Sequence, residues 1–167
     1  SRGTRVSFIW TVTVAAVSVA SRSAGVSITG GNAERLNADL NTSDFDVDIF
    51  HISPDGLTVV YHAGQTSSGF WELFSVPAHG PRELAVKINR NLGVGGSVDA
   101  YFEITPDSNT VVYRADAITN GTYNLYRVPI EDGLSVLINS GASVDTVFKI
   151  SPDGDRVVYR AGSEATQ

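Results

Sequence analysis

One phrase is written three times in this chain and constrains its fold more than any other feature. Each copy has a turn motif, Ser/Thr-Pro-Asp-Gly/Ser, followed closely by Val-Val-Tyr; the copies span Ile52–Ala63, Ile104–Ala115 and Ile150–Ala161. The aspartates of the turns lie 52 and then 46 residues apart. A period of this size is typical of repeat architectures, in which each repeat packs against its neighbours. The repeat therefore indicates an architecture, and it says far less about function.

The length and composition of the chain exclude several classes of function. The 167 residues are enough for one ordinary domain, and 42% of them are hydrophobic, which excludes an acidic disordered tail. The formal net charge of -6 lacks the clustered Lys and Arg of a nucleic-acid surface, so we expect no nucleic-acid partner. The chain has no cysteine, which excludes a disulfide framework, a thiolate zinc site and a cysteine nucleophile.

The N-terminal region allows two interpretations. Arg2 and Arg5 precede the apolar run Phe8–Ala20, which resembles a secretory signal, but Val, Ile, Thr, Phe and Trp also favour buried β-strands, and we prefer strands. The run is too short and too rich in Thr and Ser for a membrane span. Because the chain has no methionine, we expect that a leader was removed or that the sequence is part of a longer one.

Each repeat is expected to form four antiparallel strands. In the clearest copy the strands are predicted over Val98–Ile104, Val111–Ala115, Tyr123–Val128 and Leu134–Ile138. Two adjacent valines in the second strand put apolar side chains on both faces, so that strand needs cover on both sides. Four short strands in about 45 residues are one blade of a β-propeller, where neighbouring sheets supply this cover.

The turn motif has a clear chemical basis. Proline at its second position presets φ, the Ser, Thr and Asp side chains bond nearby backbone groups, and a final glycine accepts a positive φ. Ser108 replaces that glycine in the middle copy, so we expect its turn to be strained or differently shaped. The predicted structural turn residues are Pro54, Asp55, Gly56, Pro106, Asp107, Pro152, Asp153 and Gly154.

These motifs resemble the WD40-like PD40 repeat, the blade of the TolB propeller and of the propellers of prolyl-oligopeptidase-type peptidases and the tricorn protease. The shared pattern is Phe-x-Ile-Ser/Thr-Pro-Asp-Gly, then Val-Val-Tyr-x-Ala, then an aromatic third strand ending in Val-Pro; it covers residues 44–161. The resemblance implies an all-β fold of β-propeller-type blades with four antiparallel strands each.

The number of blades departs from this resemblance, because members of the family usually close six or more blades in one chain. We expect a single propeller segment over residues 1–167, with about three and a half blades at 5–43, 44–95, 96–142 and a half blade at 143–167. The first of these is a degraded copy.

An open arc of blades leaves apolar faces and a strand edge that invite association. A second copy can close the ring, since twice three and a half is seven, an ordinary propeller size. A rotation that does not close gives a fibre instead. We therefore predict self-association as a dimer or a fibre, with another protein partner as a further option. The alternative is that the missing blades lie in sequence beyond this chain.

One acidic cluster is a candidate metal site. Asp44, Asp46 and Asp48 alternate, so on a strand their carboxylates share one side and suit calcium. The competing interpretation is a solvated strand edge. Only Asp48 recurs, as Asp99 and Asp145, and we expect this recurring carboxylate to bond backbone in a neighbouring turn.

The histidines are not in metal-ligand spacing. His51 occupies the position of Glu103 and Lys149, and a position that takes either charge is expected to be exposed. The position of His62 is polar in every copy, so we expect it to line a channel mouth or to pair with acidic neighbours; its equivalents are Arg114 and Arg160.

No catalytic constellation is visible. The sequence has no Gly-x-Ser-x-Gly, and Gly93–Ser97 lies in a linker before a strand, so it forms neither a nucleophile elbow nor a dinucleotide loop. The aromatic residues of the third strands have strand spacing, so we expect them to pack in the core; they are Phe70, Trp71, Tyr123 and Tyr126.

We predict a non-catalytic β-propeller module for binding or assembly, located extracellularly or in the periplasm, with no cofactor unless calcium binds the acidic cluster. The alternative is a fragment of the N-terminal propeller of a peptidase or other hydrolase whose catalytic domain lies outside this chain.

Overall fold

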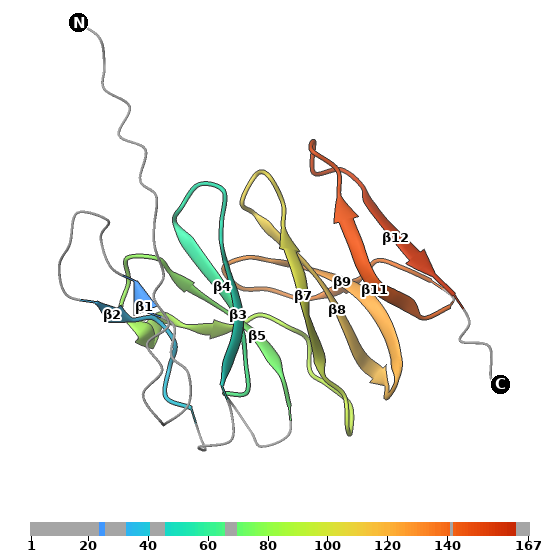
Figure 1. Cartoon of the computed structure of the whole chain (residues 1–167), viewed down its shortest axis with the longest axis horizontal. Coiled ribbons are helices and arrows are strands. Elements are labelled where there is room, and N and C mark those ends of the chain that lie inside the picture. The colour runs from blue at the N-terminus through green and yellow to red at the C-terminus, as the bar shows by residue number, and fades with distance from the viewer. Residues whose placement is uncertain (1–23, 26–32, 41–45, 66–69, 141, 163–167) are drawn as a thin grey trace, which may run out of the picture.

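The computed structural model describes residues 24–25, 33–40, 46–65, 70–140 and 142–162. The regular structure of this part is β-strand except for one short 3-10 turn, which confirms the all-β prediction. Figure 1 shows the strands gathered into sheets that stand side by side along the molecule. The apolar run Phe8–Ala20 and Asp44 lie outside the described residues.

Two sheets have four strands each, in chain order and antiparallel throughout, as predicted for propeller blades. The first blade consists of β3 (Val47–Ile52), β4 (Thr58–Ala63), β5 (Glu72–Pro77) and β6 (Val86–Lys87), with the 3-10 turn η1 (Arg82–Leu84) before β6. The second blade consists of β7 (Val98–Ile104), β8 (Thr110–Thr119), β9 (Thr122–Pro129) and β10 (Val136–Leu137).

Two smaller sheets flank these blades. On one side, β11 (Val144–Ile150) pairs with β12 (Val157–Ala161) to form a half blade, equivalent to the first two strands of a blade. On the other side, β1 (Ala24–Gly25) pairs with β2 (Glu34–Arg35). Leu36 follows β2 and is buried in the apolar cluster of the first blade that includes Tyr61. The four sheets thus form one row of stacked units (Figure 1).

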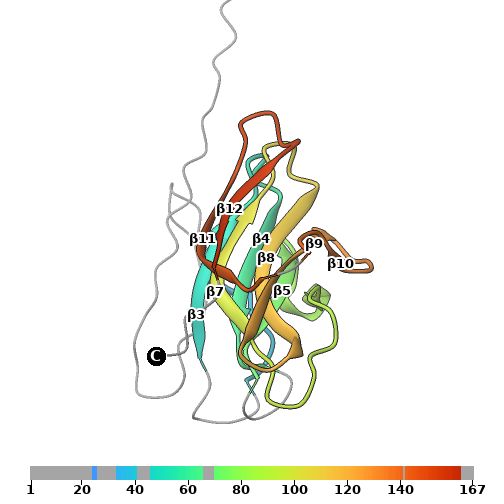
Figure 2. The same cartoon turned by 90° about the vertical axis from the view of Figure 1, so that its right-hand side faces the viewer.

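The core lies between the sheets, which Figure 2 shows one behind another. The adjacent valines of β8 illustrate why. Val111 faces the first blade and shares a cluster with Val60, whereas Val112 faces the half blade and packs with Val144 and Phe148. Both faces of the second strand are therefore covered, as the sequence predicts.

The three turn motifs have one geometry. Gly56 and Gly154 have φ values of 77° and 79°, and Ser108 adopts 64°. A serine at positive φ is strained, as predicted, but the turn keeps the shape of its glycine counterparts. Its hydroxyl accepts a hydrogen bond from the backbone N–H of Asp55 in the neighbouring turn at 3.0 Å, a contact that glycine cannot make.

Candidate functional site between the blades

A bulge near the start of each first strand carries the recurring carboxylate. The strand register shifts between Val47 and Ile49 in β3. It shifts over a longer stretch in the equivalent parts of β7 and β11, Val98–Phe102 and Val144–Phe148. A bulge redirects a side chain and locally increases strand twist. The residues in or beside these bulges are Asp48, Asp99 and Asp145.

Arg114 on β8 links the second blade to the half blade. Its guanidinium forms an ion pair with Asp99 of its own blade, and its Nε donates to the carbonyl of Val144 on β11 at 2.9 Å. The ring of Tyr123 lies 3.7 Å from the guanidinium carbon and covers it. We call this arrangement the inter-blade bridge: a bulge aspartate, a basic residue on the second strand, and the carbonyl of the first-strand valine in the next blade.

His62 forms the corresponding inter-blade bridge from the first blade. Its Nε2 lies 3.0 Å from the carbonyl of Val98, and because a carbonyl only accepts, Nε2 carries the proton. Its Nδ1 lies 3.4 Å from the Asp48 carboxylate, and the Trp71 ring stacks on the imidazole at 4.9 Å. Burial lowers the pKa of His62 below its ordinary value, although the Val98 carbonyl and Asp48 oppose this shift.

Two predictions need correction here. The bulge aspartates are predicted to bond backbone in a neighbouring turn. Instead, Asp99 and Asp145 accept backbone N–H groups of their own bulges, and the carboxylates of all three bulge aspartates face the basic residue on the second strand. Trp71 and Tyr123 are predicted to lie in the core, but they are half-buried over the bridge residues His62 and Arg114. Phe70 is also half-buried and not in the core. Only Tyr126 of that group is in the core. The sequence signal that was available is the recurrence, in all three copies, of an acidic residue in the bulge and a basic residue on the second strand.

The half blade carries the same bridge residues with their outward side open. Arg160 contacts Asp145, but its side chain is 82% exposed, against 9% for that of Arg114. Val158 is 68% exposed, whereas its equivalents Val60 and Val112 are covered by the next sheet. Within the described residues, no sheet lies against this outer face of β12.

A second line of contacts runs along the first strands. Glu103 accepts the backbone N–H of Ile150 at 2.8 Å and pairs with Lys149, so the second blade and the half blade are joined here also. Burial acts to raise the pKa of Glu103, but hydrogen bonds from Lys149 and Tyr101 bring it below its ordinary value.

His51 belongs to the same line of first-strand residues, and the prediction that it is exposed was wrong. Its ring packs on Phe102 at 4.6 Å and is half-buried, because the first strands of neighbouring blades lie close together. Burial is the main reason that the pKa of His51 is lowered.

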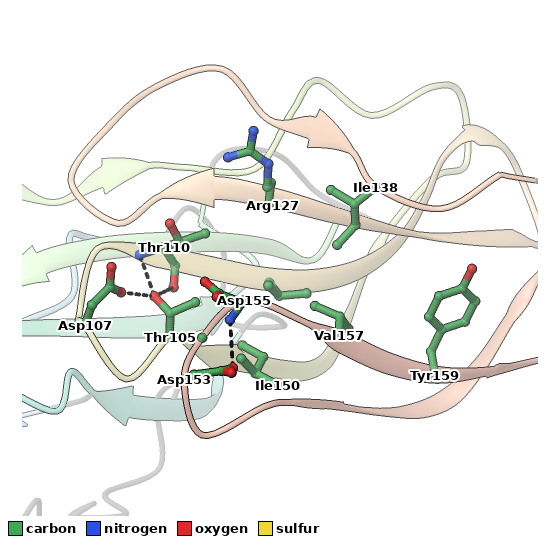
Figure 3. Close-up of a pocket in the computed structure, with 12 residues that line it drawn as sticks. Thr105, Asp107, Thr110, Arg127, Ile138, Ile150, Asp153, Asp155, Val157 and Tyr159 are labelled. Atoms are coloured by element: carbon green, nitrogen blue, oxygen red, sulfur yellow. Dashed lines mark hydrogen bonds between the residues drawn. The ribbon is translucent and has the colours of Figure 1, made fainter.

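A cavity of about 380 Å³ lies between the second blade and the half blade. Figure 3 shows its apolar wall and its polar rim, which includes Arg127 and turn carboxylates. The wall residues are Val112, Ile138, Ile150, Val157 and Tyr159, and the rim includes Thr105, Asp107, Thr110, Arg127, Asp153 and Asp155.

The predicted turn aspartates bond within their own turns. Asp107 accepts the hydroxyl of Thr105 at 2.5 Å and the backbone N–H of Asn109 at 3.1 Å. These hydrogen bonds lower the pKa of Asp107, and the serine hydroxyls of the other two turns do the same for Asp55 and Asp153.

The calcium prediction stays a prediction, because Asp44 is not among the described residues. Of the other two, Asp46 accepts the backbone N–H of Val47 at 2.7 Å and Asp48 faces His62. Within the part of the chain that the structure covers, no group of three or more acidic or histidine side chains could hold a metal. In the same part, no helix is long and apolar enough to cross a membrane.

Comparison with known proteins supports the fold. No protein-family model and no curated protein matches the chain. Among solved structures, a TolB-type protein of Agrobacterium tumefaciens is similar with a TM-score of 0.58 and 20% identity, over 84% of this chain and 45% of that one. TolB from Acinetobacter baumannii gives a TM-score of 0.58 and 16% identity, over 88% of this chain and 33% of that one.

The chain thus spans less than half the length of each of these structures. At such identities the similarity speaks for the fold alone. The strand order, the stacked sheets and these neighbours together establish blades of the PD40/WD40-like β-propeller type seen in TolB.

Proposed function

We propose that this chain is a non-catalytic β-propeller module for protein assembly, and that it binds a second copy of itself through the outer side of its half blade. The supporting observation is the contrast between Val158, which is 68% exposed, and its equivalent Val112, which is 3% exposed. The half blade carries the surface that a following blade covers elsewhere in the molecule. Such a surface favours a protein partner over a small-molecule ligand.

The chemistry of this surface supports a partner built like a blade. In the two internal interfaces, His62 and Arg114 each reach the backbone carbonyl of a valine on the next first strand. Arg160 offers the same guanidinium beside Val158. A partner presenting a first-strand carbonyl and apolar side chains would bury the valine and desolvate the charge pair, as happens at Arg114.

The contact is heterologous, because the surface on β12 differs from the surface that it would meet. Two copies that close on each other form a ring of an ordinary propeller size, and copies that fail to close form a fibre. We further propose that the protein acts outside the cytoplasm, the location that its similarity to TolB-type propellers suggests.

Light scattering coupled to size exclusion, at several protein concentrations, tests this function. We expect a species of twice the chain mass or larger, and we expect Val158→Asp to shift it to the chain mass without loss of β-structure in circular dichroism. Val94→Asp is the matched control, since Val94 is 99% exposed on a loop. A monomeric wild-type chain at all concentrations would exclude self-association.

A second candidate is a portion of the propeller of a larger protein, such as a peptidase or other hydrolase. It is favoured by the comparisons, in which this chain matches only 45% and 33% of the neighbours' lengths. The coding sequence downstream of Gln167 decides this: further PD40 repeats followed by a Gly-x-Ser-x-Gly hydrolase region would support it.

A further inference from the structure

The cavity beside β12 corresponds to the space that a third strand fills in the preceding interface. There, Tyr126 and Val128 of β9 pack into one cluster with Val60 and Leu73 of the first blade. The half blade has equivalents of the first two strands only, and its third-strand position coincides with the cavity lined by Val157 and Tyr159. The cavity is thus shaped for an extended segment that pairs with β12.

The two observed third strands define what such a segment looks like. Leu73–Val76 reads Leu-Phe-Ser-Val and Leu125–Val128 reads Leu-Tyr-Arg-Val: an aliphatic, an aromatic, a polar residue and a valine. In both strands the aromatic residue and the valine share a cluster on the side of the preceding sheet. An occupant of the cavity therefore needs an aromatic residue and a valine two positions apart.

This four-residue pattern occurs once more in the 167-residue sequence, at Ile9-Trp10-Thr11-Val12. No other aromatic residue of the sequence follows an aliphatic residue and is itself followed by a polar residue and then a valine. We propose that the cavity beside β12 accepts residues 9–12 of a second copy as an antiparallel third strand. This inference rests on the proposed function and adds a second contact to it: the same second copy would also bind the edge and the inner side of β12.

The register follows from the observed pairs. Tyr61 lies opposite Phe74, and Tyr113 lies opposite Tyr126. The same register sets Trp10 opposite Tyr159 and therefore Thr11 opposite Val158. Trp10 and Val12 then fill the cavity, and the strand satisfies the open hydrogen-bonding edge of β12, which is the mode of β-strand addition.

The distribution of charge favours this occupant. Residues 1–33 contain three arginines and no acidic residue, so the rest of the chain holds the other nine basic residues and all eighteen acidic ones. The rim of the cavity follows this imbalance, with Asp107, Asp153 and Asp155 against Arg127. A basic segment is therefore attracted to this acidic end of a second copy, which steers association without requiring a specific ion pair.

Disulfide trapping tests the pairing in a chain that has no native cysteine. Residues opposite each other on antiparallel strands lie about 4.5 to 5.5 Å apart at Cα, a spacing that a disulfide spans. Chains carrying Thr11→Cys are mixed with chains carrying Val158→Cys and oxidised. We expect mixed dimers to exceed both homodimers at least several-fold. Val94→Cys, on a loop and even more exposed than Val158, is expected to give no such excess with Thr11→Cys.

A second measurement removes the central side chain. We expect Trp10→Asp to weaken association by about tenfold or more, because aromatic residues buried at interface centres contribute most to binding. The circular dichroism spectrum and thermal midpoint of the monomer are expected to stay as in wild type.

The outcomes separate this inference from the proposed function. Self-association by light scattering without preferential Thr11–Val158 trapping overturns the inference and leaves the proposed function standing. A monomeric chain overturns both. If the double variant Thr11→Cys/Val158→Cys forms its disulfide within one chain at high dilution, the segment binds its own copy, and the second-copy assignment is overturned.

Discussion

The two interfaces of the second blade share their inner contacts and differ in their outer ones. On both sides, first strands pack together and an inter-blade bridge reaches a valine carbonyl, through His62 on one side and Arg114 on the other. On the first-blade side, β9 fills the outer space, whereas on the half-blade side a cavity of about 380 Å³ remains. The inner strands and the bridge thus suffice to align neighbouring blades, and the outer strands supply apolar filling.

The largest effect is expected from placing a charge in the filled interface. Val60→Asp would bury an unpaired carboxylate at a position that is fully covered, and we expect it to lower the free energy of unfolding by about 4 kcal/mol or more. Val158→Asp changes the equivalent residue of the half blade, and we expect it to lower the free energy of unfolding of the monomer by less than about 0.5 kcal/mol. Urea unfolding at low protein concentration measures both.

The ratio of these two effects tests the alignment of the repeats. A comparable loss in both variants would mean that the outer face of β12 is covered already within the monomer. That result would contradict the contrast between the two interfaces, and the half blade would have to be completed by another part of the same chain.

An intermediate effect is expected from the bridge itself. Arg114→Ala removes the ion pair with Asp99 and the hydrogen bond to Val144, and leaves a partly buried carboxylate, so we expect a loss of about 2 kcal/mol. Arg160→Ala removes an exposed pair and is expected to cost less than about 0.5 kcal/mol. Hydrogen exchange checks the location of the effect: Arg114→Ala should increase exchange in β11 and β12 and spare β4 and β5.

Much of the fold was predictable because the repeat encodes it locally. The turns, the two-sided burial of the adjacent valines and the order of four strands all follow from residues within one copy. The pairing of the second-strand His62, Arg114 and Arg160 with acidic neighbours was one of two predicted options and is confirmed. The reach of His62 and Arg114 to the next blade was not predicted, because it depends on a backbone carbonyl that has no sequence signature. The environment of His51 was missed for a similar reason: the polar side chain is half-buried because two first strands of neighbouring repeats lie close together.

A smaller effect distinguishes the two bridges by pH. Burial lowers the pKa of His62 below its ordinary value of 6.5, so the unfolded chain binds more protons than the folded chain just below that pH. Stability is therefore complete above about pH 6.5 and declines as the pH falls toward the folded pKa. His51 contributes in the same direction. Urea midpoints between pH 5.5 and 8 should show this slope.

Substitution by the residue of the other blade is the sharpest control for the histidine. His62→Arg installs a side chain that stays charged across this pH range, so the dependence of stability on pH should become weaker. The dependence that remains is expected to come from His51 and to disappear when His51→Gln is added. A stability that rises as the pH falls would contradict the prediction, because it would mean that Asp48 stabilises the protonated imidazole more than burial disfavours it.

The smallest effect concerns the contact between neighbouring turns. Ser108→Gly relieves a positive φ, which favours glycine by about 1 kcal/mol, but it removes the hydroxyl that accepts the N–H of Asp55. The gain from relieving the backbone strain and the loss of the hydrogen bond are similar in size. We therefore expect the free energy of unfolding to change by no more than about 0.5 kcal/mol.

The reverse substitution, glycine to serine in the other two turns, separates the backbone strain from the effect of the hydroxyl hydrogen bond. Gly154 and Gly56 have nearly equal φ, so serine brings the same strain to both. A Cβ on Gly154 would meet Pro106 of the neighbouring turn at an ordinary 3.5 Å, whereas one on Gly56 would meet nothing within 4 Å. We therefore expect Gly56→Ser to lower the free energy of unfolding by about 1 kcal/mol. Gly154→Ser should lower it by less, because the introduced serine hydroxyl can accept the N–H of Asp107, as Ser108 accepts that of Asp55. Equal losses in urea unfolding would mean that the hydroxyl contact between turns contributes nothing, and that Ser108 is merely tolerated.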